Sequence, residues 1–333
     1  MNPTDPQPIQ TAFTRQAGVD YPILCGAMYP CSNPELVAAA SAAGAMGIVQ
    51  PISLTYVHGR EFRAGLREIR ALTHKPIGFN AIVEKSVQRY EDRLREWVDI
   101  SLEEGVRFFV TALGNPRWVV DAVHATGGIV YHDVTERRWA DKALQEGVDG
   151  LICVNRRAGG HAGDRGPEEL HAELADLGVP LILAGGVGNE TQFKAALDMG
   201  YDGVQMGTRF IATSECVVHA DYHAAILEAS EEDIVLTDKL SGVPCSVINT
   251  PLIERLGASA GPLAAWLLRH PRTKHWMRTF YALRSLRQLK RSSQRGLSYR
   301  DVFQAGKSVG SIHEVEPAGD IVRRFVRKAQ EPN

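Results

Sequence analysis

Short apolar runs alternate with longer amphipathic segments along most of the chain. Several of the longer segments end in glycine just before the next apolar run, as at Gly105, Gly147 and Gly200, which is typical of a helix followed by a strand. Alternating strands and helices predict parallel strands joined by right-handed crossovers, and eight such units predict an α/β fold, the closed (β/α)8 TIM barrel. The expected strands are residues 23–26, 46–49, 77–80, 108–110, 129–131, 150–154, 181–184 and 203–206.

A doubly wound open sheet is the alternative architecture for the same alternation. That fold normally carries G-x-G-x-x-G after its first strand, where the glycines let the backbone approach a dinucleotide. Here the first strand leads into Cys25-Gly26-Ala27-Met28-Tyr29-Pro30, which lacks this fingerprint. The closed barrel is therefore favoured.

The chain's 333 residues, 44% hydrophobic and 23% charged, are typical of a soluble globular protein with one large domain and a smaller addition. We expect the barrel at residues 12–215 and a mainly helical lid or insertion at residues 216–300. Residues 301–333 are expected to form a closing segment that packs back on the barrel.

The overall charge and the cysteines exclude several classes of protein. A net charge of −2 gives no general attraction to nucleic acid or an anionic membrane, and no apolar run reaches transmembrane length. The first ten residues are polar and proline-rich, without the apolar core of a secretory signal. The five cysteines form no C-x-x-C pair, which favours reduced thiols over a disulfide framework or a zinc site. The sequence predicts a cytoplasmic protein without nucleic-acid or membrane partners.

Residues 269–295 form a strongly basic stretch with no acidic residue. Trp276, Phe280 and Leu283 recur at helical spacing, which predicts an amphipathic helix with its apolar face on the barrel and its basic face in solvent. Recognition of a phosphate, as in coenzyme A or a dinucleotide, is the alternative role.

Glycine and polar clusters follow the carboxyl ends of several expected strands, and in a barrel these ends share one rim. The clusters after the seventh and eighth strands occupy the position where barrels commonly bind phosphate through backbone N–H groups. The sequence therefore predicts a phosphorylated cofactor at this rim. The residues concerned are Gly26, Ala27, Met28, Asn80, Gly159, Gly185, Gly186, Gln205, Met206, Gly207 and Thr208.

The run Arg156-Arg157-Ala158-Gly159-Gly160-His161-Ala162-Gly163 places one imidazole among small residues directly after the sixth strand. Glycine lets the backbone approach a ligand closely, and the unperturbed pKa of histidine suits proton transfer near neutrality. His161 is accordingly the candidate catalytic residue, with a tight turn and a solvated imidazole as the alternative. Arg156 and Arg157 are candidate anion-binding groups for the substrate, or else surface arginines paired with acids.

Three further histidines stand at positions of interest. His132, with Asp133, follows the fifth expected strand and is a candidate substrate contact or a partner that orients His161, although a rim hydrogen bond without a catalytic role explains it equally well. His219 and His223 lie four residues apart, but no third ligand is evident. We therefore expect no metal.

Several of these motifs, in the same order, resemble the nitronate monooxygenase family of FMN-dependent barrel enzymes. The resemblance implies that Asn80, Gly159, Gly186 and residues 205–208 bind FMN, that residues 26–28 pass along the isoalloxazine ring, and that His161 is the catalytic imidazole. Cys25, Val154 and Arg157 depart from the family pattern. The matching segments are residues 21–28, 78–80, 147–152, 158–163, 184–187, 202–210 and 305–310.

The activity implied by the resemblance is oxidation of alkyl nitronates by O2 to a carbonyl compound and nitrite. The alternative within the same superfamily is an FMN reductase that takes hydride from NAD(P)H and passes it to a quinone or an enoyl thioester. A flavin-binding protein without catalysis is a third class, and it gives no reason for an imidazole beside the ring. The oligomeric state is left open, a homodimer included.

Overall fold

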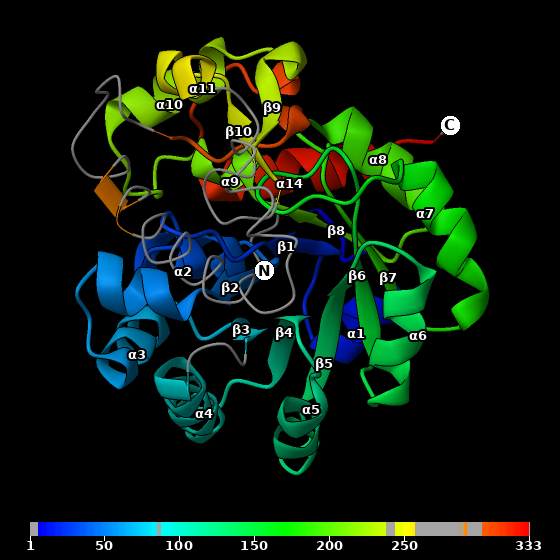
Figure 1. Cartoon of the computed structure of the whole chain (residues 1–333). Helices are drawn as coiled ribbons and strands as arrows, with labels where there is room; N and C mark the ends of the chain where they lie inside the picture. Colours follow the sequence, from blue (N-terminus) through cyan, green and yellow to red (C-terminus); the bar gives the residue numbers. More distant parts are fainter. Residues whose placement is uncertain are drawn as a thin grey trace, which may run out of the picture.

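The computed structural model describes residues 6–84, 88–237, 244–256, 287, 290–291 and 302–332. Within them, eight parallel strands close into a barrel in chain order, with β8 pairing with β1 (Figure 1). The predicted (β/α)8 TIM barrel is confirmed. The strands are β1 (Ile23–Cys25), β2 (Met46–Val49), β3 (Ile77–Val83), β4 (Phe108–Leu113), β5 (Ile129–Val134), β6 (Gly150–Val154), β7 (Leu181–Ala184) and β8 (Gly203–Met206).

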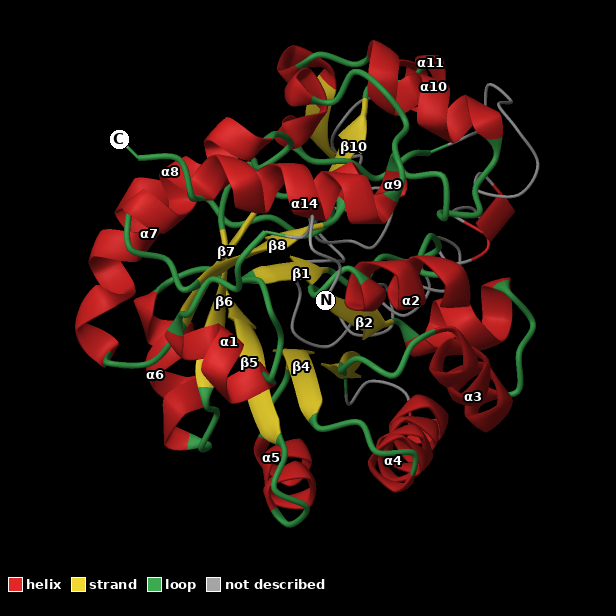
Figure 2. Cartoon of the chain, turned by 180° about the vertical axis from the view of Figure 1, so that it is seen from behind, coloured by secondary structure: helices red, strands yellow, loops and turns green. Residues whose placement is uncertain are grey.

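Helices surround the strands (Figure 2), and local sequence signals begin several of them. Pro34 and Pro167 each stand at a helix start, where proline's fixed φ is already helical. Asn189 caps another helix, since its Oδ1 accepts the Gln192 N–H at 2.9 Å. These elements are α1 (Ala12–Ala17), α2 (Pro34–Ala42), the π-helical turn η1 (Ser53–Val57), α3 (Phe62–Leu72), α4 (Gln88–Glu103), α5 (Arg117–His124), α6 (Arg137–Gln145), α7 (Pro167–Leu174), η2 (Ala175–Leu177) and α8 (Glu190–Asp198).

Alternate residues along each strand face the barrel interior or the helices. Phe13 of α1 lies in the interior, with its ring centroid 5.7 Å from that of Phe108 and 5.9 Å from that of Tyr131. The other fully or largely buried interior residues are Leu24, Met46, Ile48, Val110, Ile152, Ile182 and Ala184. Their neighbours in sequence, including Cys25, Phe109, Val130, Leu151 and Leu183, pack in the layer between strands and helices. This alternation, here called the interior parity of each strand, determines which polar side chains can reach the interior.

The chain beyond β8 adds a smaller layer of elements next to the barrel (Figure 1). It contains an antiparallel pair of strands, β9 and β10, which the sequence did not indicate. A backbone bridge between Gly160 and Ser246 joins β10 to the loop after β6. The elements are α9 (Thr208–Ile211), α10 (Ala220–Glu228), η3 (Glu231–Asp233), β9 (Ile234–Thr237), β10 (Cys245–Ile248) and α11 (Pro251–Leu256).

The last described segment, residues 302–332, returns to the barrel through η4 (Lys307–Ser311) and α14 (Ala318–Ala329). The apolar face of α14 is buried, and this helix packs against α8 and α2 (Figure 2). It thereby covers β8 and β1, the strands at which the barrel closes.

Arg209 ties this segment to α9 from inside the protein. Its side chain is 2% exposed, and its Nη2 donates to the carbonyl oxygens of Ala212 and Glu314 at 2.7 Å each. Nη1 lies 3.4 Å from a carboxylate oxygen of Glu316. A buried guanidinium held in this way fixes the chain entering α14, because displacing it would leave a charge and two carbonyls unpaired.

All five cysteines are buried thiols, as the absence of a C-x-x-C pair predicted. Among the described residues, none of the helices combines the length and apolarity that crossing a membrane requires. Most of the basic stretch 269–295 lies outside the described residues. Lys290 is an exception, and its Nζ donates to the Tyr56 carbonyl at 2.5 Å while lying 4.1 Å from the centroid of the Tyr56 ring.

Candidate active site at the carboxyl end of the barrel

The loop after β6 is held by contacts from three other parts of the chain. The fully buried Asn155 accepts the Arg157 N–H through Oδ1 at 2.8 Å and donates from Nδ2 to the Gly185 carbonyl at 2.9 Å. A Cβ at Gly159 would lie 2.8 Å from the Gly306 nitrogen, so only glycine fits there. Asn155 is a site residue that the sequence analysis missed.

His161 follows this turn. Gly160 has φ +68 and its carbonyl accepts the Ser246 N–H at 2.7 Å, which fixes the backbone beside the imidazole. His161 keeps an exposed surface, yet the surrounding protein desolvates its ring and lowers its pKa from the ordinary value of 6.5. The imidazole is therefore neutral at pH 7 and able to accept a proton.

The turns after β7 and β8 present several backbone N–H groups to the carboxyl end of the barrel. Gly185 and Gly186 have φ +113 and +87, and the N–H groups of Gly186, Gly207 and Thr208 have no hydrogen-bond acceptor within the described ranges. The Thr208 hydroxyl accepts the Gly306 N–H at 3.0 Å, which leaves its own proton free to donate. A set of N–H donors on the turns after two adjacent strands suits a phosphate group.

Polar side chains from two strands face the interior near its carboxyl end. Asn80 of β3 and Gln205 of β8 follow the interior parity, and neither side chain has a hydrogen-bond partner in the part of the chain that the structure describes. A Cβ at Gly26 would lie 2.9 Å from the Gln205 Cγ, so the glycine leaves room for this amide. Met28 approaches the turn after β8, with its sulfur 3.5 Å from the Cβ position of Gly207.

His132 and Asp133 lie within β5 rather than after it, because this strand continues to Val134. His132 shares its face with Val130 and Val134 in the helix layer, and its Nδ1 is 2.8 Å from the Thr111 Oγ1. Burial lowers the pKa of His132 to about 4. His132 therefore faces the helix layer rather than the barrel interior, and its predicted contact with substrate stays a prediction. Asp133 faces the interior in its place.

The side chains of the two arginines before the glycine turn contact different parts of the protein. Arg156 has a 58% exposed side chain whose Nη1 lies 3.7 Å from a Glu169 carboxylate oxygen at the start of α7. Arg157 packs over Gly186, with its Nε 2.6 Å from that residue's Cβ position, and its Nη2 is paired with Glu231 at 2.5 Å. The two guanidinium groups therefore do not form one clamp beside His161.

The histidines at 219 and 223 have other partners. His219 caps α10 by accepting the Asp221 N–H at 3.2 Å, and His223 Nε2 is 2.9 Å from the Ile211 carbonyl. The described residues hold no group of three potential metal ligands.

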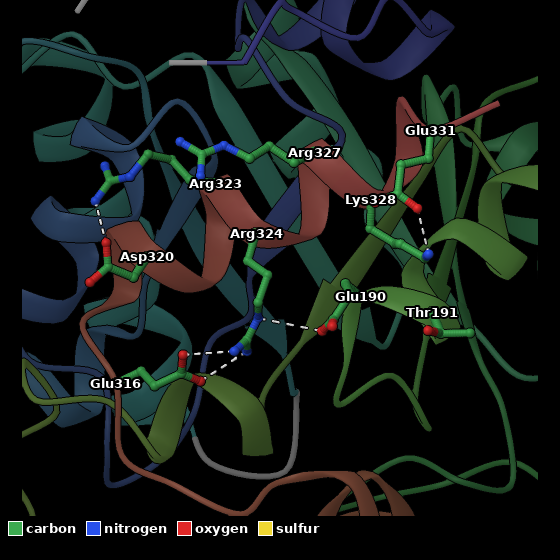
Figure 3. Close-up of a pocket in the computed structure, with 9 residues that line it drawn as sticks. All are labelled: Glu190, Thr191, Glu316, Asp320, Arg323, Arg324, Arg327, Lys328 and Glu331. Atoms are coloured by element: carbon green, nitrogen blue, oxygen red, sulfur yellow. Dashed lines mark hydrogen bonds and ion pairs between the residues drawn. The ribbon is translucent and has the colours of Figure 1, made fainter. Parts of the chain in front are cut away.

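A groove of about 570 Å³ lies on the outside of the molecule, between α14 and the start of α8 (Figure 3). Arg324 crosses it with both Nη atoms on Glu316 at 2.8 and 2.9 Å. Acidic and basic side chains alternate around the groove and neutralise one another, and none of the predicted site residues lines it. The lining residues are Glu190, Thr191, Glu316, Asp320, Arg323, Arg324, Arg327, Lys328 and Glu331.

Comparison with known proteins agrees with this geometry. The family model described as nitronate monooxygenase matches residues 10–328. A CoA-thioester dehydrogenase of Rhodococcus jostii, which acts on a hydroxy-methyl-oxo-octahydroindene carboxyl-CoA, is 26% identical over 96% of both chains. A nitronate monooxygenase of Pseudomonas aeruginosa is 29% identical over 69% of this chain and 77% of its own. The solved structure of FabK from Thermotoga maritima has a TM-score of 0.79 and 27% identity, and covers 97% of this chain and 96% of that one.

Proposed function

The chain belongs to the nitronate monooxygenase family of oxidoreductases, and from this premise we propose that it oxidises alkyl nitronates with O2 to a carbonyl compound and nitrite. The observation that carries the proposal is the position of the His161 imidazole, directly after a glycine turn that Ser246 holds by a backbone hydrogen bond, next to strand-end N–H groups that have no acceptor among the described residues. Members of this family are flavoproteins, and we propose FMN as the cofactor.

The site residues fit FMN in two ways. The free N–H groups of Gly186, Gly207 and Thr208 would hold its single phosphate, and the polar groups of Asn80 and Gln205 would face the edge of its ring. When bound, FMN would accept electrons from the substrate and deliver them to O2. The chain's own residues have to bind the two ligands, orient them and move the proton.

His161 has a role that depends on the form of the substrate. A preformed nitronate has already lost its α-proton, whereas a neutral nitroalkane must lose it before oxidation. Since burial lowers the pKa of His161, its ring nitrogen is unprotonated at neutral pH and can accept that proton as a general base. The positively charged imidazolium that results would stabilise the anionic nitronate beside it.

A second candidate is an NAD(P)H-linked oxidoreductase that acts on an acyl thioester or a quinone. The share of this chain that each relative matches favours this candidate, since the CoA-thioester dehydrogenase matches 96% of the chain and the nitronate monooxygenase matches 69%. In that reaction His161 would position or protonate the substrate.

Anaerobic mixing of the purified, flavin-loaded protein with one reductant at a time separates these candidates. Bleaching of the flavin absorbance by a preformed alkyl nitronate, followed by nitrite release on admitting O2, is the expected result. Bleaching by NADH or NADPH alone would replace the first proposal with the second. Mass spectrometry of the released cofactor tests FMN independently, and FAD or no flavin would contradict the cofactor assignment.

A further inference from the structure

Asp133 places a carboxyl group in the apolar barrel interior, where the part of the chain that the structure describes offers it no partner. It lies on β5 two residues after the interior residue Tyr131 and pairs across the sheet with Ile152, another interior residue. Its Oδ1 is fully buried and has no hydrogen-bond partner among the described residues, while the residue as a whole keeps some exposed surface. Burying a carboxyl oxygen without a hydrogen bond costs free energy, and a ligand that supplies a donor or an acceptor would offset that cost.

Burial also determines the protonation of this group. Desolvation raises the pKa of Asp133 from 3.8 to about 7, and no charged residue contributes to the shift. The titratable groups on the elements around it are Tyr131 on its own strand, the buried Cys153 on β6, and His161 on the loop that follows. The pKa of the Cys153 thiol is itself raised by burial, so this thiol stays neutral. The described residues around the interior therefore supply no cation that would hold Asp133 ionised.

We propose that the neutral carboxyl group of Asp133 donates a hydrogen bond to the isoalloxazine ring, so that binding of the flavin ring is linked to a proton. The inference rests on the proposed flavin cofactor but not on the nitronate substrate. Asn80 and Gln205 supply amides near the same end of the interior, and Asp133 adds an O–H donor between them in strand order. The heteroatoms at the edge of an isoalloxazine ring are acceptors for such a donor.

Riboflavin is the probe that tests this contact, because it has the ring without the phosphate, whose own titration near pH 6 would obscure the profile. Riboflavin binding to the apoprotein is measured by fluorescence at several pH values from about 5.5 to 8.5. For the native chain we expect the dissociation constant to be constant at low pH and to rise above pH 7, by up to about tenfold per pH unit. The midpoint potential of the FMN-loaded protein should fall more steeply with pH over the same range, since an ionised Asp133 opposes electron density on the ring.

Three variants give the proposal matched controls. Asp133→Asn keeps a donor that does not titrate, so it should bind riboflavin at all these pH values with a flat profile. Asp133→Leu removes the donor and should bind riboflavin about tenfold or more weakly than native protein at pH 6, also with a flat profile. His132→Gln changes the adjacent side chain on the helix face and should keep the native profile.

Equal pH profiles for the native protein and Asp133→Asn would overturn the proposal, as would native-like binding by Asp133→Leu. Either result would leave the proposed nitronate oxidation untouched. If nitronate fails as a substrate while the riboflavin profiles of the native protein and its three variants are as expected, the Asp133 contact stands and the substrate assignment falls. A native protein that binds neither riboflavin nor FMN at any pH would overturn both.

Discussion

Removing the Arg157 guanidinium should weaken binding of FMN while leaving binding of riboflavin nearly unchanged. The Arg157 side chain lies over Gly186, whose free N–H belongs to the predicted phosphate-binding turns. Its Nη2 is held by Glu231 at 2.5 Å, which keeps the guanidinium in place before any ligand arrives. Riboflavin lacks the phosphate, so the ratio of the two dissociation constants isolates a contact to that group.

The size of the effect follows from the exposure of the pair. A charge-assisted hydrogen bond to phosphate contributes roughly 1.5–3 kcal/mol when it is well shielded. The Arg157 side chain is 29% exposed and already shares its charge with Glu231, so solvent screening lowers the expected value to about 1–1.5 kcal/mol. Arg157→Met should therefore weaken FMN binding about five- to tenfold.

Flavin fluorescence titrations of the native protein, Arg157→Met and Arg156→Met measure this directly. Arg156 is the matched control, because the same substitution one residue earlier removes a guanidinium that is 58% exposed and faces Glu169. Its FMN and riboflavin affinities should both stay within about twofold of the native values. Raising the ionic strength should reduce the loss in Arg157→Met, since screening weakens the contact that was removed.

Equal losses for FMN and riboflavin in Arg157→Met would refute the reasoning, because a phosphate contact cannot affect a ligand without phosphate. The same loss in Arg156→Met would also refute it. In either case steady-state kinetics with one anionic and one neutral substrate would test the sequence-based prediction that these arginines bind the substrate.

Three other predictions use matched controls. Gly186→Ala should lose the bound flavin and its yellow colour, because a Cβ there meets the arginine side chain at φ +87, whereas Gly178→Ala, at φ +69 in open space, should keep both. His161→Ala should lower kcat/KM for neutral nitroalkanes about 10²- to 10⁴-fold and kcat/KM for preformed nitronates much less, and equal losses on both substrates would exclude the base role. In the native protein, the rate with nitroalkanes should fall only below pH 6.5, where the imidazole becomes protonated. Arg209→Met should lower the free energy of unfolding, measured in urea, by about 3–5 kcal/mol, and Arg323→Met, on the surface, should lower it by less than about 0.5 kcal/mol. Similar losses in the two variants would show that the buried Arg209 contacts do not stabilise the fold.

The order of the barrel could be predicted from the chain alone. Each β-strand is a short apolar run and each connection is long enough for a helix, so the alternation determines parallel strands and their sequence in the sheet. The glycines after β6, β7 and β8 could be predicted too, because their places at strand ends are local. His161 was found by this local signal.

The direction of each side chain at a strand end could not be predicted. The apolar run of β5 ends at Tyr131, but hydrogen bonding to β4 and β6 carries the strand on to Val134. Adjacent residues in a strand point to opposite faces, so this extension sends His132 to the helices and Asp133 to the interior. A shift of a single residue would have exchanged them.

Local pattern thus determined the fold class, the strand order and the position of the candidate imidazole of His161 in this protein, since periodicity and glycine turns act over a few residues. Only the tertiary structure decided which groups surround that imidazole. Gly306 lies against Gly159, and Glu231 pairs with Arg157, although these partners are far apart in the sequence. The Gly306 contact forms because residues 302–332 bury the apolar face of α14 on the barrel, and that packing brings the rest of the segment onto the loop after β6. Glu231 lies against Gly310 of the same segment, which holds its carboxylate near Arg157.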